Sequence, residues 1–179
     1  MKKSSHLRMA NRVLERSGKK LRKKCKVAFL FGNIAPDLYI IFKTHMCGST
    51  LKNVRYHIEK LSILEYKNKY NVMYYFRLGM IMHYICDYYC RAHNELSVVQ
   101  AIKHKKYERG LGKYIKEHSN IKFKEFTSTN KEGDILRIIE SAHEEYVRDI
   151  KNKVHSYYKD LLMSLSVNSA IFKICTVNC

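Results

Sequence analysis

The sequence predicts an all-α protein, a single-domain multi-helix bundle packed around one central buried helix. Seven Gly and one Pro are too few for an all-β fold, which needs turn residues about every 8–12 positions. Apolar residues make up 46% of the 179-residue chain. Because a fold of this length buries roughly 70% of the surface that its unfolded chain exposes, we expect one domain over residues 1–179 with a substantial core.

Apolar residues recur at helical spacing along most of the chain. The first helix is expected from about Ser5 to Lys24, with a serine as its N-cap. A buried apolar segment, Val27–Phe31, and a Gly-Asn turn precede a short helix started by Pro36. A polar loop is expected over Asn120–Gly133. The remaining predicted helices span about residues 51–65, 70–92, 96–117, 134–165 and 170–177.

The charge balance is strongly positive, with 34 Lys and Arg against 16 Asp and Glu, or +18 with neutral His. Eleven of these cations lie within residues 2–26, and a solvated helix face accounts for most of that bias. Such a charge attracts both an anionic membrane surface and nucleic acid, so it does not distinguish them. With no signal-peptide pattern and no apolar run near the roughly 18 residues that span a bilayer, we expect a cytoplasmic protein that can bind membranes peripherally.

The central predicted helix carries His83, Asp87 and His93 in an otherwise apolar segment, where buried polar groups need partners. His83 and Asp87 are four residues apart, so they share one helix face and either bind one metal ion or form a hydrogen-bonded core pair. His93 lies ten residues beyond His83, about 15 Å along a continuous helix. If all three bind metal, we expect at least two ions along this helix.

The next predicted helix repeats the four-residue spacing with His104 and Glu108. This pair could complete a metal site with His93, because two imidazoles and one carboxylate leave an open position for water. On a Lys-rich helix, a simple surface pair is the alternative interpretation. The interpretation of this pair as a metal motif depends on the other candidate ligands in the chain.

These motifs together resemble the bacterial zinc-dependent phospholipase C family, whose relatives include the fungal-type single-strand nucleases. The family carries an HxxxDxxxxxH helix followed by an HxxxE pair, as this chain does over residues 83–108. Further matches lie upstream at Gly32–Asp37, at Phe42–His45 and at Ser5–His6. The motifs follow the family order from residue 6 to residue 108.

The resemblance implies that the helical domain holds two or three zinc ions per chain, with ligands on the central helix. It makes Asp37 a candidate general base as well as a ligand, and it places Phe42 where relatives have an aromatic residue of the choline pocket. The implied first site is Asp37, His45, His83 and Asp87, the second is His93, His104 and Glu108, and the third is His6, Asp87 and the α-amine of Met1.

Clustered zinc ions suit phosphodiester hydrolysis, because they activate water and neutralise charge on phosphate and leaving group. We therefore expect a phospholipase C that cleaves phospholipids to diacylglycerol and a phosphorylated headgroup by zinc-hydroxide attack. Glu108 favours a phospholipid substrate, because the nuclease relatives tend to use Asp there. The alternatives are a single-strand nuclease and a non-catalytic basic zinc module that binds membranes or nucleic acid through residues 2–26.

Overall fold

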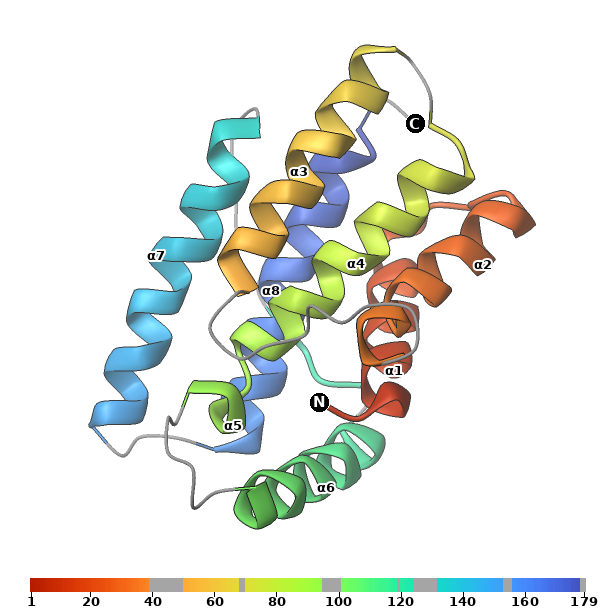
Figure 1. Ribbon diagram of the computed structural model, residues 1–179. Helices are drawn as coiled ribbons and strands as arrows, with labels where there is room; N and C mark the ends of the chain where they lie inside the picture. Colours follow the sequence, from red (N-terminus) through yellow and green to blue (C-terminus); the bar gives the residue numbers. More distant parts are fainter. Residues whose placement is uncertain are drawn as a thin grey trace.

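The computed structural model is all-α, as predicted (Figure 1). It describes residues 1–38, 50–67, 70–94, 101–118, 120–123, 132–152 and 156–177, and these residues contain no strand. Within this part of the chain, none of the helices combines the length and the apolarity needed to cross a membrane. The elements are α1 (Lys3–Ser17), α2 (Lys23–Gly32), the 3-10 helix η1 (Ala35–Asp37), α3 (Thr50–Tyr66), α4 (Val72–Tyr88), α5 (Arg91–Asn94), α6 (Ala101–Glu117), α7 (Glu132–Lys151) and α8 (Tyr157–Cys175).

The first helix is shorter than predicted, because α1 ends at Ser17 rather than near Lys24. Gly18 adopts φ 64°, a left-handed conformation that glycine tolerates, and its N–H donates to the Glu15 carbonyl. The apolar segment expected to be buried at Val27–Phe31 lies within the separate helix α2, where only Ala28 and Phe29 of the segment are buried and both Val27 and Phe31 are exposed. The single long helix predicted here is therefore wrong.

The long helix predicted over 134–165 is also wrong, because two helices, α7 and α8, occupy this region. Ser156 starts α8, with its side chain accepting a hydrogen bond from the N–H of Lys159. The same helix runs on to Cys175, so the separate helix predicted over 170–177 is mostly its last turns.

Asn71 caps the N-terminus of α4, and its side chain accepts hydrogen bonds from the N–H groups of Met73 and Tyr74. Twelve of its 17 residues are buried, and it packs against α2, α3 and α8. It ends at Tyr88, and α5 begins at Arg91 after a short turn. The helix predicted to continue to residue 92 is therefore interrupted before His93.

Two glycines allow α2 and α4 to pack backbone against backbone. A Cβ atom added at Gly32 would overlap the Phe76 carbonyl oxygen, and one added at Gly79 would overlap the Phe29 carbonyl oxygen. Neither position can carry a side chain unless the helices separate. The contact holds the C-terminal end of α2, and so the segment leading to η1, against the middle of α4.

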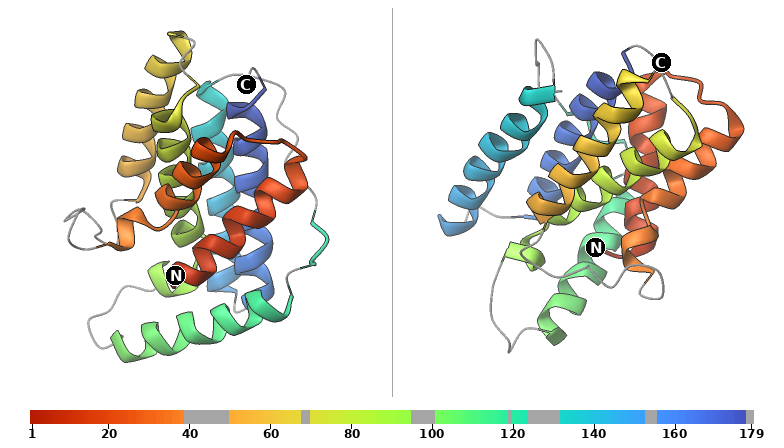
Figure 2. Two further views of the ribbon diagram at one scale, coloured as in Figure 1. Left: turned by 90° about the vertical axis from the view of Figure 1, so that its right-hand side faces the viewer. Right: turned by 45° about the horizontal axis from the view of Figure 1, so that its top comes forward.

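A buried carboxylate, Asp160 of α8, joins the other end of the bundle. It accepts hydrogen bonds from the Tyr146 hydroxyl of α7 at 2.5 Å, the Tyr107 hydroxyl of α6 at 2.8 Å and the Arg91 N–H of α5 at 3.3 Å. Burial and the Asp160 carboxylate raise the pKa of both phenols, which keeps them protonated as donors. One side chain thereby ties α8 to three helices, with α6 lying across the end of the bundle beside the N-terminus (Figure 2).

Gly79→Ala is expected to destabilise the protein. Alanine in a helix interior ordinarily stabilises by about 1 kcal/mol over glycine, but here the methyl group meets the α2 backbone, and such overpacking costs about 1–3 kcal/mol. Urea unfolding measures the difference. Gly112→Ala is the control, because its new methyl first meets the rotatable Ser5 hydroxyl. Unchanged or increased stability of the Gly79 variant would contradict the close helix contact.

Tyr146→Phe is expected to lower the free energy of unfolding by about 1–3 kcal/mol, because the buried Asp160 carboxylate loses a donor. The same chemical change at the exposed Tyr158 should have little effect and serves as the matched control. Thermal or urea unfolding of the two variants tests this. Equal stabilities of the Tyr146 and Tyr158 variants would show that the hydrogen bond from Tyr146 to Asp160 does not contribute to stability.

Candidate metal centre

The first cluster of candidate ligands consists of His6 from α1 with His83 and Asp87 from α4. The Asp87 carboxylate lies 3.3 Å from His83 Nε2 through Oδ2 and 3.4 Å from His6 Nε2 through Oδ1. The two imidazole rings stack at 4.0 Å between centroids. All three side chains are buried, so α1 and α4 together bring two imidazoles and one carboxylate to one point inside the protein.

The second cluster consists of His93 from α5 with His104 and Glu108 from α6. Glu108 Oε1 lies 3.0 Å from His104 Nε2 and 3.3 Å from His93 Nε2. The four-residue spacing places His104 and Glu108 on one face of α6, as predicted from the sequence. The side chains are partly exposed, so this cluster is open to incoming molecules in a way that the first is not.

The α-ammonium group of Met1 lies between the two clusters. It is 2.5 Å from Asp87 Oδ1, 3.0 Å from Glu108 Oε1 and 3.1 Å from His93 Nε2. Burial lowers the pKa of this amine, but the carboxylates of Asp87 and Glu108 outweigh that effect and raise it to about 12. A cation is therefore stabilised at this point by ligands from both clusters.

The clusters are closer to each other than a continuous helix would allow. Because α4 ends at Tyr88, the chain turns and returns His93 to within 3.5 Å of Asp87 Oδ1. The two sites expected about 15 Å apart along one helix thus share the Asp87 carboxylate. His6, which the family motifs place in a third site, lies with His83 and Asp87.

The residues fit zinc in donor chemistry and in spacing. Around a tetrahedral zinc ion with bonds of about 2.0–2.1 Å, neighbouring ligand atoms lie about 3.3 Å apart, and the separations within both clusters are 3.0–3.4 Å for the pairs that include a carboxylate oxygen. Neither ring nitrogen of buried His6 makes a hydrogen bond within the described residues. Burial and the neighbouring His83 lower the pKa of His6 to about 3, which keeps the ring in its neutral, metal-binding form.

Two backbone carbonyls orient the imidazoles, and sequence reasoning did not identify them. The Asn33 carbonyl lies 2.9 Å from His83 Nδ1, and the Ala92 carbonyl lies 3.1 Å from His104 Nδ1. Such contacts fix which nitrogen faces a metal, here Nε2 in both rings. The Asn33 carbonyl is brought to His83 by the contact of α2 with α4. In the sequence, Gly32 of the matched Gly32–Asp37 motif is an indirect indication of that contact.

Asp37 in η1 lies beside the first cluster. Its Oδ1 lies 3.9 Å from His83 Nε2 and its Oδ2 lies 4.0 Å from His6 Nε2. Asp37 also lines a cavity of about 620 Å³ that opens beside the clusters. The other residues lining this cavity are Met1, Lys2, Lys3, Ser4, His93, His104, Lys105 and Glu108.

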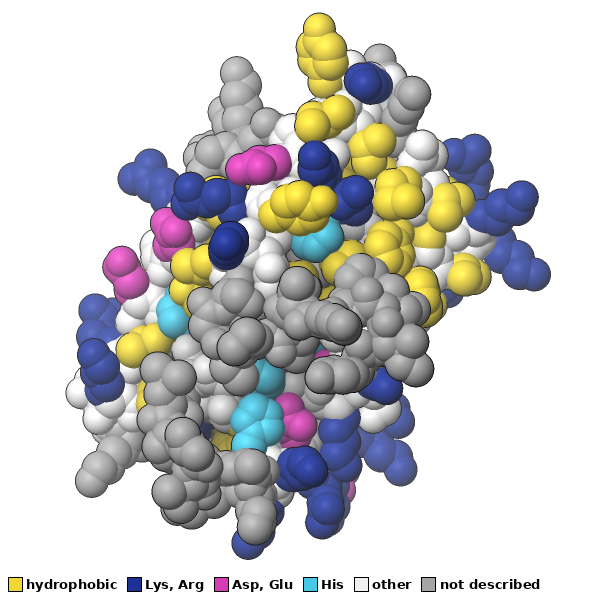
Figure 3. Space-filling view, viewed as in Figure 1, with side chains coloured by type: hydrophobic (Ala, Val, Ile, Leu, Met, Phe, Trp, Pro, Cys, Tyr) yellow, Lys and Arg dark blue, Asp and Glu magenta, His cyan; other side chains and the backbone are white. Residues whose placement is uncertain are grey.

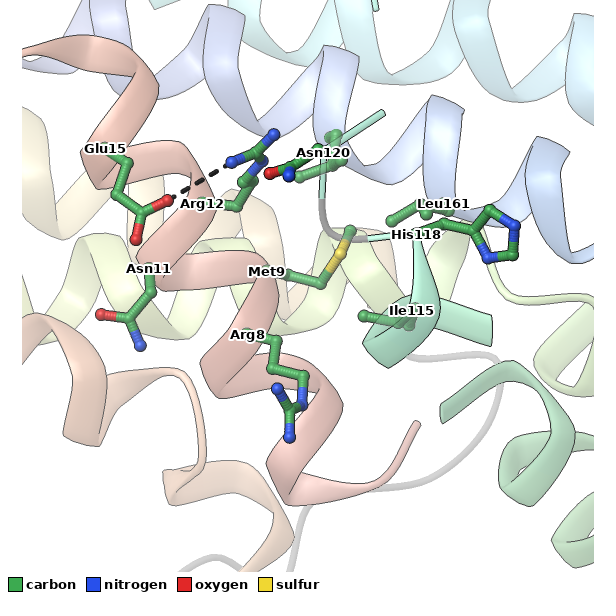
Figure 4. Close-up of a pocket in the computed structure, with 10 residues that line it drawn as sticks. Arg8, Met9, Asn11, Arg12, Glu15, Ile115, His118, Asn120 and Leu161 are labelled. Carbon is green, nitrogen blue, oxygen red and sulfur yellow. Dashed lines mark hydrogen bonds and ion pairs between the residues drawn. The ribbon is translucent and has the colours of Figure 1, made fainter. Parts of the chain in front are cut away.

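The remaining two predicted site residues, Phe42 and His45, lie outside the described residues. The other eight positions meet around the two clusters and their cavity. A second cavity, of about 440 Å³, lies between α1, α8 and the end of α6 (Figure 4). It is lined in part by Arg8, Arg12 and His118 and contains none of the predicted ligands, so it is separate from the candidate metal centre.

One comparison with known proteins identifies the family of this chain. A family model described as zinc-dependent phospholipase C matches residues 5–153, a stretch that includes every candidate ligand except Met1. No curated protein and no solved structure gives a match. The chain therefore belongs to the zinc-dependent phospholipase C family.

Proposed function

We propose that this protein is a zinc-dependent phospholipase C that cleaves phospholipids to diacylglycerol and a phosphorylated headgroup. The observation that carries the proposal is the pair of ligand clusters joined through Asp87 at the edge of an open cavity. Catalytic zinc sites leave room for water and substrate, whereas structural sites are closed by four protein ligands. The open second cluster therefore favours an enzyme over a non-catalytic zinc module.

Two or three zinc ions would be held by the two clusters, with Asp87 between them. The Met1 α-amine, whose pKa is raised to about 12, would have to release its proton to serve as a third-site ligand. His45 is proposed as a further ligand of the first site, from the family motif alone. Bound zinc supplies activation of water and neutralisation of phosphate charge. The protein's own contribution is to keep His6 neutral and to hold the ligand nitrogens in a fixed orientation.

Asp37 is placed to act as the general base. Its side chain is partly exposed in the cavity, with its carboxylate 3.9–4.0 Å from two ligand nitrogens, so a water molecule at the first cluster lies within its reach. Lys2, Lys3 and Lys105 are among the residues that line the same cavity, and their positive charges would attract the phosphodiester group.

The substrate is proposed from the second cluster and the family. Glu108 stands where nuclease relatives tend to carry Asp, and Phe42 matches the aromatic position of the headgroup pocket. The lysines at the cavity would also suit a nucleic acid backbone, so a single-strand nuclease is the competing activity that the assay below includes.

Zinc content tests the second cluster directly. We expect two or three zinc ions per wild-type chain by elemental analysis, and a higher melting temperature with zinc than with a chelator, since a ligand that binds only the folded state stabilises it. His104→Gln should lower the zinc content and reduce this stabilisation. His118→Gln, an exposed histidine just beyond the same helix, is the matched control and should retain both. Equal zinc contents in the two variants would show that His104 is not a zinc ligand.

Activity tests the reaction and the substrate. Zinc-loaded protein should release diacylglycerol from phosphatidylcholine or anionic phospholipid, and a chelator should abolish the release. Asp37→Asn should lower kcat by about 10²–10⁴-fold, as expected for loss of a general base. Nucleotide release from single-stranded DNA, without diacylglycerol, would establish the nuclease instead. If zinc-loaded protein hydrolyses none of these substrates, the non-catalytic zinc module is the supported alternative.

A further inference from the structure

Exposed apolar side chains are concentrated on three helices of this protein. Among the described residues, nine large hydrophobic side chains are exposed, and seven of them belong to α2, α3 and α4. The other two, Tyr158 and Val177, lie on α8 and just beyond it. The seven are Val27, Phe31, Tyr56, Ile63, Tyr66, Val72 and Met73.

These seven side chains lie on adjoining helices, and we call them together the docking face. Helix α4 packs against both α2 and α3, so the three helices adjoin one another through α4. Phe31 of α2 also meets the partly buried Phe76 of α4, with 5.8 Å between ring centroids. Figure 3 shows the hydrophobic side chains gathered over these three helices.

Basic residues accompany the docking face. The segments 22–31, 52–67 and 71–77, which carry it, contain nine Lys and Arg and only two acids, Glu59 and Glu65. The Lys60 ammonium lies 5.6 Å from the centre of the Tyr56 ring. Aliphatic and aromatic side chains interspersed with lysines are typical of surfaces that enter the interface of an anionic membrane, where lysine stems lie along apolar groups and their charges reach the phosphates.

This composition favours a lipid surface over other partners. The buried centre of a protein–protein interface is depleted of lysine, whereas lysines are mixed among the apolar residues here. A nucleic acid would use the positive charge but gain little from exposed Val, Ile and Met side chains. An anionic membrane interface uses both features.

The docking face and the metal centre open on the same side of the molecule. In Figure 3, His and acidic side chains are visible on the face that carries the hydrophobic patch. Helix α4 connects the two, with Val72 and Met73 at its start and His83 and Asp87 near its end. A bilayer that met the docking face would therefore lie on the side from which the cavity is reached.

We propose that the docking face binds the surface of a bilayer containing anionic phospholipid. The proposal rests on the proposed function, because it supplies the means by which a phospholipase C reaches lipids packed in a membrane. Val27, Phe31, Tyr56 and Ile63 enter the headgroup region, and the neighbouring lysines pair with anionic headgroups.

Vesicle binding tests the docking face. Zinc-loaded wild-type protein should co-sediment with vesicles of 70% phosphatidylcholine and 30% phosphatidylglycerol, and it should bind pure phosphatidylcholine vesicles at least tenfold more weakly. A triple variant with Phe31→Ser, Tyr56→Ser and Ile63→Ser should lose at least tenfold in affinity for the anionic vesicles. The control carries Tyr158→Ser and Val177→Ser, which change exposed apolar residues elsewhere, and should bind like wild type. Circular dichroism confirms that each variant is folded.

Hydrolysis assays separate this proposal from the proposed function. The triple variant should cleave a monomeric short-chain phosphatidylcholine at the wild-type rate but cleave anionic vesicles at least tenfold more slowly. Vesicle binding without any hydrolysis would refute the phospholipase and leave the docking face supported. Equal vesicle binding by the triple variant and wild type would overturn the docking face, as would a concentration-dependent dimer, measured by sedimentation, that the triple variant abolishes.

Discussion

The arrangement of the candidate metal centre depends on one buried carboxylate, Asp87. Burial alone would raise its pKa, but the Met1 ammonium and the imidazoles around it lower the pKa well below its usual range. A buried anion of this kind is costly unless positive or hydrogen-bonding groups surround it. His6 of α1, His83 of its own helix and His93 of α5 all converge on it. The polar and charged groups that this buried carboxylate gathers therefore link three helices and the N-terminus.

Contacts away from Asp87 position the helices that carry its partners. The glycine contact between α2 and α4 brings the Asn33 carbonyl to His83 Nδ1 and places η1, with Asp37, beside the first cluster. At the other end, Asp160 joins α8 to α5, α6 and α7. The second cluster lies on α5 and α6, so the polar contacts of Asp160 position it. The first cluster is positioned instead by the close glycine contact between α2 and α4.

Helix α4 carries ligands of the candidate metal centre as well as residues of the docking face. The start of α4 contributes to the docking face, and its end contributes His83 and Asp87. The helix is continuous between them, so it sets the separation of the two features along its axis. One continuous helix between the two features suits the proposed phospholipase C, whose substrate would stay in a membrane while its phosphodiester group reaches the cavity.

The sequence by itself determined the helical class and the chemistry of the ligands, because periodicity and four-residue spacing are local properties of a helix. It predicted the pairing of His104 with Glu108, which needs only one helix. Only the tertiary structure decided that α4 stops at Tyr88 and that His93 therefore returns to Asp87. The stacking of His6 on His83 and the position of the Met1 amine likewise depend on how distant segments pack, which no local spacing encodes.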